Sequence, residues 1–232
     1  MGRFVSIRGS RSWAQIPTRP LFVSLLLPSA AVLGAVFLQP WLPVADVLRL
    51  PPAAPENSAC CHLFVGAVTR LGNLMCVATA SVCLFTALLA HIAGAGRGKT
   101  LFFVTAGLFS IGLGVGVVLD LPAAIDDVQP VSVAVLAAGL LAYVAASRRV
   151  ATARAALLVT AVLALAASVA IRMAVPEYTP FWMFAEDALK FIGITFWTGF
   201  HVVAATQSGE ELATGRVTTV SFSPERIVRR PA

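Results

Sequence analysis

The chain has 232 residues, of which 58% are hydrophobic and only 12% are charged, and its mean hydropathy is +0.86. This composition excludes an ordinary soluble domain and is typical of an integral membrane protein. The formal net charge of +6 does not indicate a nucleic-acid-binding protein, because the basic residues are not interleaved with aromatic ones and no nucleic-acid-binding motif is present.

Long apolar runs predict the organisation of the chain. A helix crosses the bilayer core with about 20 predominantly apolar residues, and six runs predict such spans, at residues 21–44, 63–93, 101–121, 131–147, 155–175 and 181–206. The expected fold is therefore an all-α integral membrane protein, a bundle of six transmembrane helices. A basic N-terminal arm and a C-terminal tail would flank it, which gives the domains 1–20, 21–206 and 207–232.

The distribution of charge predicts the orientation of these spans. Lysine and arginine are concentrated in cytoplasmic loops, and here they gather in the N-terminal arm, the second and fourth connections and the tail. Both termini are therefore expected in the cytoplasm, and a residue usage rich in alanine, valine and arginine favours the inner membrane of a bacterium. The expected partners are the bilayer, anionic lipid headgroups on the cytoplasmic side and, within a complex, other membrane subunits; no nucleic acid is expected.

Several polar residues fall inside the predicted spans, where a charged side chain costs about 2.5–3.5 kcal/mol on insertion scales. Glu186 and Lys190 are four residues apart in the last span, so they share a helix face and can form an ion pair. Depth along the helices places the other polar residues in the same outer half. Such a cluster either binds a ligand or handles protons, or it locks helices together through paired charges. The predicted cluster comprises Arg70, Asn73, Asp120, Arg172, Glu186, Asp187 and Lys190.

Carboxylates and histidines raise the question of a cofactor. Clustered carboxylates suit hard cations such as Mg²⁺ or Ca²⁺, which makes Asp120, Asp126 and Asp127 candidate metal ligands. His91 and His201 fall towards the cytoplasmic ends of two spans, where a facing pair could ligate a haem. We do not expect a haem there, because one histidine in each of two helices is weak support for it, and the cofactor stays unknown.

Glycines within the spans predict close helix packing. Gly112 and Gly116 form a GxxxG pattern, Gly107 extends the same glycine-rich segment, and Gly193 lies on the helix face of Glu186. Because glycine has no side chain, the backbones of two helices can approach closely at such positions. We therefore expect these four glycines at contacts between neighbouring helices.

Three segments together resemble an uncharacterised family of bacterial multipass membrane proteins. They are HLFVGAVTRLGNLMCVATASVCLFTALL (62–89), GVVLDLPAAIDD (116–127) and FAEDALKFIGITFW (184–197). In that family, helix two carries a similar S-N-L-G-x-L-x-x-C-A-x-A-x-C-L-F stretch. Helix three ends in L-D-D followed by a downstream H-E pair, and the last helix carries E-[ED]-G-L-K-x-x-G-I. The resemblance implies about six transmembrane helices and no established activity.

The resemblance also implies correspondences for the charged residues. Asp120 matches the first acid of the helix-three motif, Asp126 and Asp127 match the H-E pair, and the last-helix motif matches Glu186, Asp187, Lys190 and Gly193. The chain departs from the family's pattern in the second acid, the histidine, the last-helix glycine and the helix-two serine. Leu121 stands in place of the second acid, Asp126 in place of the histidine and Ala188 in place of the glycine, and Arg70 lies near the position of the serine.

Two classes of function remain open. The first is a non-enzymatic polytopic membrane protein, either a transport or sensing module whose polar cluster binds an ion or a small ligand, or an accessory subunit of a membrane complex. The second is a membrane-embedded enzyme that acts on lipid-linked substrates at the outer leaflet. The residue pattern favours the first class, because it contains no serine-nucleophile motif and no set of histidines at one depth for a catalytic zinc. The enzyme's acids, bases or metal ligands would be Asp120, Asp126, Asp127, Glu186 and Asp187.

Overall fold

The structure, a computed structural model, describes residues 18–40, 44–48, 66–118, 143, 155–175 and 179–214. The regular elements in this part of the chain are α-helices, which confirms the predicted all-α class. Four of them are long and apolar enough to cross a membrane, so the chain is a multipass membrane protein. In chain order the helices are α1 (Thr18–Leu38), α2 (Val44–Leu48), α3 (Ala67–Ile92), α4 (Arg97–Val118), α6 (Ala155–Ala174) and α7 (Pro180–Ala213).

The helices occupy the predicted apolar runs but differ from them at their ends. The first predicted span, 21–44, ends too late, since α1 ends at Leu38 because Pro40 disfavours a helical conformation at the residue before it. The short α2 begins only at Val44, where the predicted span ends. The last helix continues past Thr206, its predicted end, to Ala213. The four helices with the length and composition of membrane spans are α1, α3, α6 and α7.

Parts of the predicted organisation lie outside the described residues. The fourth predicted span, 131–147, is one of them, apart from Tyr143. Most of the basic N-terminal arm and the end of the C-terminal tail are others. The predicted third span, 101–121, overlaps α4 over residues 101–118, and α4 is not among the four helices named above.

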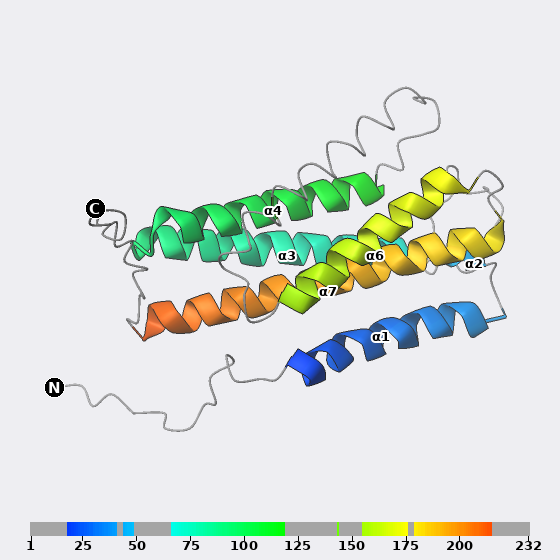
Figure 1. Ribbon diagram of the computed structural model, residues 1–232, viewed down its shortest axis with the longest axis horizontal. Helices are drawn as coiled ribbons and strands as arrows, with labels where there is room; N and C mark the ends of the chain where they lie inside the picture. Colours follow the sequence, from blue (N-terminus) through cyan, green and yellow to red (C-terminus); the bar gives the residue numbers. More distant parts are fainter. Residues whose placement is uncertain are drawn as a thin grey trace, which may run out of the picture.

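Helix α7 holds the bundle together (Figure 1). It packs against α6, α3, α1 and α2, while α3 and α4 lie side by side. The connection between α3 and α4 passes through Gly94 and Gly96, whose φ angles are 66° and 92°, a conformation that costs glycine little. The amide of Gly94 donates to the carbonyl of His91 at 3.1 Å, and that of Ala95 donates to the carbonyl of Ala90 at 2.9 Å. This turn ends α3 and returns the chain antiparallel along α4.

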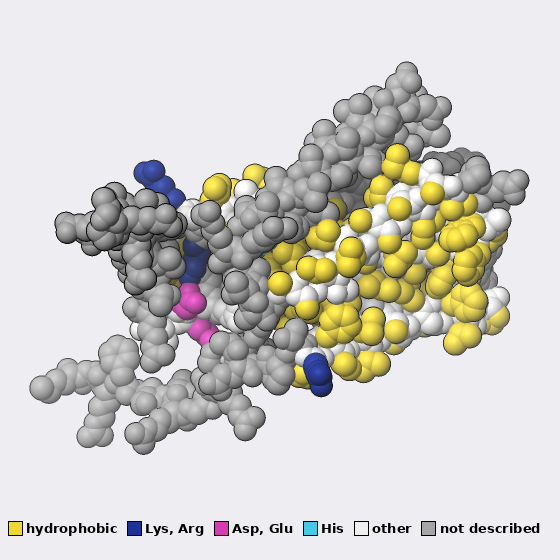
Figure 2. Space-filling model, viewed as in Figure 1, with side chains coloured by type: hydrophobic (Ala, Val, Ile, Leu, Met, Phe, Trp, Pro, Cys, Tyr) yellow, Lys and Arg dark blue, Asp and Glu magenta, His cyan; other side chains and the backbone are white. Residues whose placement is uncertain are grey.

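The core lies where α7 meets α3, α4 and α6, and its largest fully buried side chains include Phe103, Phe196 and Trp197. The outer faces of the helices are apolar as well, since Leu27, Leu74 and other large hydrophobic side chains are exposed on them. Figure 2 shows this broad hydrophobic surface, with the few visible charged side chains at its margins. Exposed to water, such a surface would cost about 25 cal/mol per Å². It is therefore suited to contact with the lipid bilayer.

Candidate functional site

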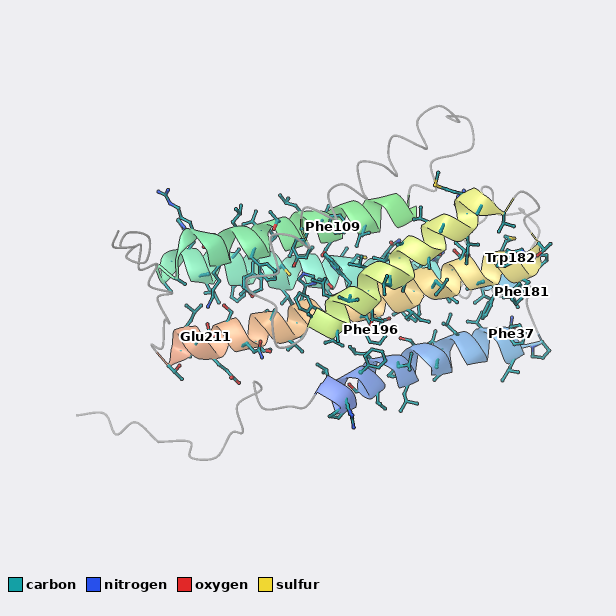
Figure 3. The ribbon with its side chains drawn as sticks, viewed as in Figure 1. Phe37, Phe109, Phe181, Trp182, Phe196 and Glu211 are labelled. Carbon is teal, nitrogen blue, oxygen red and sulfur yellow. The ribbon has the colours of Figure 1, made fainter. Side chains whose placement is uncertain are left out.

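The candidate site lies where the end of α6 meets the beginning of α7. α6 ends at Ala174 and α7 begins with Pro180, and proline is favoured in the first helical turn because its missing N–H would have no partner there. Phe181 and Trp182 of α7 lie at this end of the bundle, whereas Glu211 lies at the opposite end (Figure 3). Exposed aromatic residues are enriched at membrane interfaces, and the end that carries them here is the one predicted to face outwards.

Four charged side chains, which we call the outer cluster, meet at this end: Arg172 of α6 and Glu186, Asp187 and Lys190 of α7. The Lys190 ammonium donates to Oε1 of Glu186 at 3.2 Å and to Oδ1 of Asp187 at 3.3 Å. The Arg172 guanidinium lies 3.8 Å from the same Oε1. The cluster therefore joins α6 to α7 through a shared carboxylate, and its formal charges sum to zero.

Burial differs sharply between the anions and the cations of the outer cluster. The side chains of Glu186 and Asp187 are 2% and 11% exposed, whereas those of Arg172 and Lys190 are 40% and 31% exposed. A buried carboxylate without a partner would be very costly, so the pairing explains how Glu186 is tolerated. The two cations are the part of the cluster that faces outwards from the protein.

The other residues of the predicted polar cluster have different positions. Arg70 is exposed on α3 and forms no ion pair with another residue of the described ranges. Oδ1 of Asn73 is buried, and no hydrogen-bond partner is found for it in the described part of the chain. Asp120, Asp126 and Asp127 lie outside the described residues. Within those ranges, no three histidine, cysteine or acidic side chains are placed to hold a metal ion.

Close helix packing lies directly below the outer cluster. A methyl group added at Gly193 of α7 would lie 2.7 Å from Cγ of Leu165 and 3.2 Å from the carbonyl oxygen of Ala161, both in α6. Contacts this short are inside van der Waals distance, so a side chain here would displace Leu165 or the backbone of α6. The absence of a side chain at Gly193 thus allows the approach that brings Arg172 to Glu186.

The remaining glycines differ in what surrounds them. A methyl group at Gly107 would lie 2.8 Å from Cγ of Leu84, whereas one at Gly112 would have no neighbour within 4 Å. The surroundings of Gly116 are not among those described. Two further close contacts were not predicted: Gly114 against Cys76 at 3.2 Å and Gly199 against Leu25. These positions link α4 to α3 and α7 to α1.

A second polar group, buried in the aromatic core, was missed by the sequence analysis. The hydroxyl of Tyr143 lies 2.6 Å from Nε2 of His201, and Nδ1 of His201 lies 2.8 Å from the carbonyl oxygen of Trp197. Nε1 of Trp197 donates to the hydroxyl of Ser110 at 2.9 Å. A carbonyl only accepts, so Nδ1 carries a proton, and Tyr143 donates to Nε2 of the neutral imidazole. One feature of the sequence could have indicated this group: Trp197 and His201 are four residues apart and therefore share one face of α7.

This geometry bears on the haem considered above. His91 is exposed near the end of α3, whereas His201 is fully buried with both ring nitrogens engaged. Ligation of a metal by His201 would require breaking its bond to Tyr143 or to Trp197. The polar group formed by Tyr143, His201, Trp197 and Ser110 therefore acts as a closed hydrogen-bonded unit that positions α4 and α7 in the core.

The comparisons with known proteins extend no further than one family. A family described as a domain of unknown function (DUF8692) matches residues 117–204, a range that includes α6 and the whole outer cluster but well under half of the chain. No curated protein matches the chain. No solved structure matches it either.

Proposed function

We propose that the chain crosses the inner membrane of a bacterium six times, with both termini in the cytoplasm. In addition to the four apolar helices, residues 101–118 of α4 contain no charged side chain, and residues 131–147 form a further apolar run. Both are close to the length that spans the bilayer core, about 20 residues. Arg97 and Lys99 at the start of α4 favour the cytoplasmic side for that end.

Within this topology the chain is a non-enzymatic transport or sensing module that binds a small polar or charged ligand at the outer cluster. The observation that carries this proposal is Glu186, which is 2% exposed inside an apolar helix and is paired with cations of two helices. Ionisable residues in membrane helices are costly and mark binding sites or proton paths by default. The exposed cations of the same cluster supply groups that a ligand can reach.

An accessory subunit is the second candidate, and it is favoured by the surface of α1. This helix packs chiefly on α7, and it leaves large apolar side chains such as Leu27 and Phe37 exposed. A neighbouring membrane protein could cover that face, as lipid could. In that case the outer cluster would serve to hold α6 and α7 together.

The enzymatic alternative depends on residues that lie outside the described ranges, Asp120, Asp126 and Asp127. The two acids of the site that are described, Glu186 and Asp187, are each paired with Lys190. A carboxylate held in an ion pair is a poor general base for a substrate unless that pair opens. Catalysis by these residues therefore stays a prediction, and we favour binding.

The test is a thermal-shift screen of the purified full chain against ions, small polar solutes and lipids. A ligand that binds the folded state raises the unfolding temperature by mass action. We expect at least one ligand whose effect disappears in Lys190→Met but persists in Arg97→Gln, which removes a cation at the other end of the bundle. If no ligand produces a shift that depends on the outer cluster, the binding function is wrong.

A further inference from the structure

The outer cluster presents its charges unequally. Its two carboxylates are nearly inaccessible, while the Arg172 and Lys190 side chains keep 40% and 31% of their surface exposed. An approaching molecule therefore meets the side chains of the two cations before it meets the carboxylates. The chemistry of this surface is complementary to an anion, although the four charges balance overall.

Arg172 has unused hydrogen-bonding capacity. Its Nη1 lies 3.8 Å from Oε1 of Glu186, which is longer than a hydrogen bond, and within the described ranges the guanidinium donates no hydrogen bond. A guanidinium carries five N–H donors in a fork that matches two oxygens of a phosphate. The loose contact with Glu186 holds the side chain in place while leaving this fork open.

Exposed apolar side chains flank Arg172 along α6. Val169, one helical turn before Arg172, and Met173, directly after it, are 38% and 65% exposed. On α7, Phe181 is likewise exposed at the same end of the bundle. A cation flanked by apolar surface near a helix end is suited to an amphipathic anion, with the charged group on the cation and the chains along the apolar side chains.

The depth of the cluster agrees with such a ligand. Arg172 lies about 3 Å from the end of α6, and Glu186 lies about 9 Å from the start of α7, at 1.5 Å per residue. Lys190 is deeper, but its ammonium reaches back to Glu186. These groups thus lie near the boundary between the hydrocarbon core and the headgroup layer, where lipid phosphates are found.

From these observations we propose that Arg172 and Lys190 bind the phosphate of an anionic phospholipid in the outer leaflet. The proposal rests on the binding function given above and names its ligand. Glu186 acts as a buried counter-charge that positions both cations without blocking their exposed sides. A soluble phosphate would share the headgroup chemistry, but it would gain nothing from Val169 and Met173.

The test is a titration of the purified full chain in detergent, with unfolding temperature and native mass spectrometry as readouts. The probes are phosphatidylglycerol, phosphatidylcholine with the same acyl chains, and inorganic phosphate. We expect phosphatidylglycerol to be retained and to stabilise the chain, and the other two to do so far less. Arg172→Gln should weaken the binding of phosphatidylglycerol about tenfold, the equivalent of one charged hydrogen bond.

Two further variants make the result interpretable. Arg172→Lys keeps the positive charge beside Glu186 but loses the fork, so it should fold normally and still bind phosphatidylglycerol more weakly. Arg97→Gln removes an exposed cation from the other end of the bundle and should bind it like the unaltered chain. Unaltered binding by both Arg172→Gln and Lys190→Met would overturn the proposal, as would equal stabilisation by inorganic phosphate.

The outcomes also separate this inference from the binding function itself. If phosphatidylglycerol has no effect while another solute stabilises the chain in a manner that needs Lys190, the lipid ligand is wrong and the binding function stands. If the effect of every probe is independent of Lys190 and Arg172, both are wrong.

Discussion

The ammonium group of Lys190 lies 3.2 Å from Oε1 of Glu186, one helical turn earlier in α7. The same oxygen lies 3.8 Å from Arg172 of α6. A single buried carboxylate oxygen therefore joins a contact within one helix to a contact between two helices. The stability of the α6–α7 pair should consequently depend on which of the three charges is present.

The first prediction concerns this shared carboxylate. Lys190→Met removes the cation that donates to Glu186 at 3.2 Å, so we expect a loss of about 1–3 kcal/mol of unfolding free energy. Adding Glu186→Gln to this variant removes the buried charge that faced Lys190 and should restore part of the loss. Thermal unfolding of the detergent-solubilised chain measures both effects, with Arg97→Gln as the control.

An unchanged unfolding temperature in Lys190→Met would show that the pair contributes nothing to stability. The pairing of Lys190 with Glu186 would likewise be contradicted if the double variant lost more unfolding free energy than the two single variants lose together.

The fold was largely predictable because lipid imposes a simple requirement on sequence. A span needs about 20 apolar residues, and runs of that kind locate α1, α3, α6 and α7. The helix ends were less predictable, because they depend on local chemistry and not on hydropathy. Pro40 limits α1, while Gln207, Glu210 and Glu211 are good helix formers although they are polar, and α7 continues to Ala213.

The site was predictable only where it is local in sequence. The spacing of Glu186 and Lys190 predicts a shared helix face whatever the tertiary structure. The bond between Tyr143 and His201 joins residues 58 positions apart, and nothing in either segment indicates that their helices meet. Long-range pairs of this kind depend on packing, which hydrophobic periodicity does not specify.

The second prediction concerns the contact between α6 and α7 below the outer cluster. Gly193→Ala places a methyl group 2.7 Å from Cγ of Leu165 and 3.2 Å from a backbone oxygen of α6. The Leu165 side chain or the two helices must then shift, and we expect a loss of about 1–3 kcal/mol, as is usual for overpacking. Thermal unfolding of the purified chain measures the loss.

The matched control is Gly112→Ala in α4, where the added methyl group has no neighbour within 4 Å. Alanine is the better helix former by about 1 kcal/mol, so this change should be neutral or stabilising. Equal destabilisation by the two changes would contradict the assigned role of Gly193.

The third prediction concerns the buried hydrogen bond of His201. Tyr143→Phe keeps the aromatic ring among its neighbours but leaves Nε2 of His201, a fully buried residue, without a donor. The expected cost is about 1–3 kcal/mol, the penalty for an unsatisfied buried polar group. Adding His201→Leu should recover part of that loss, and His91→Leu, on an exposed histidine, should change little. If Tyr143→Phe is as stable as the unaltered chain, the bond does not contribute.

The fourth prediction compares an exposed ion pair with the buried one. Nζ of Lys99 in α4 lies 2.5 Å from Oε2 of Glu211 in α7, but the two side chains are 26% and 45% exposed. Solvent and salt screen such pairs, which contribute about 0–1 kcal/mol. Lys99→Gln should therefore lower stability much less than Lys190→Met, and its effect should vanish at high salt. A loss as large as that of Lys190→Met would show that burial does not decide the strength of these pairs.

The last prediction tests the proposed topology with the two threonines that flank α7. Thr179 and Thr214 are both exposed, and the helix between them has the length and composition of a membrane span. Cys60 and Cys61 lie in the connection between the first two predicted spans, which the topology places outside, so they would react themselves and are first replaced by serine. In that background Thr179→Cys should react with a membrane-impermeant maleimide in intact cells. Thr214→Cys should react only after the membrane is opened, because the positive-inside rule places that end in the cytoplasm. Labelling of both positions in intact cells would contradict the crossing, and the reverse pattern would invert the orientation and move the outer cluster to the cytoplasmic leaflet.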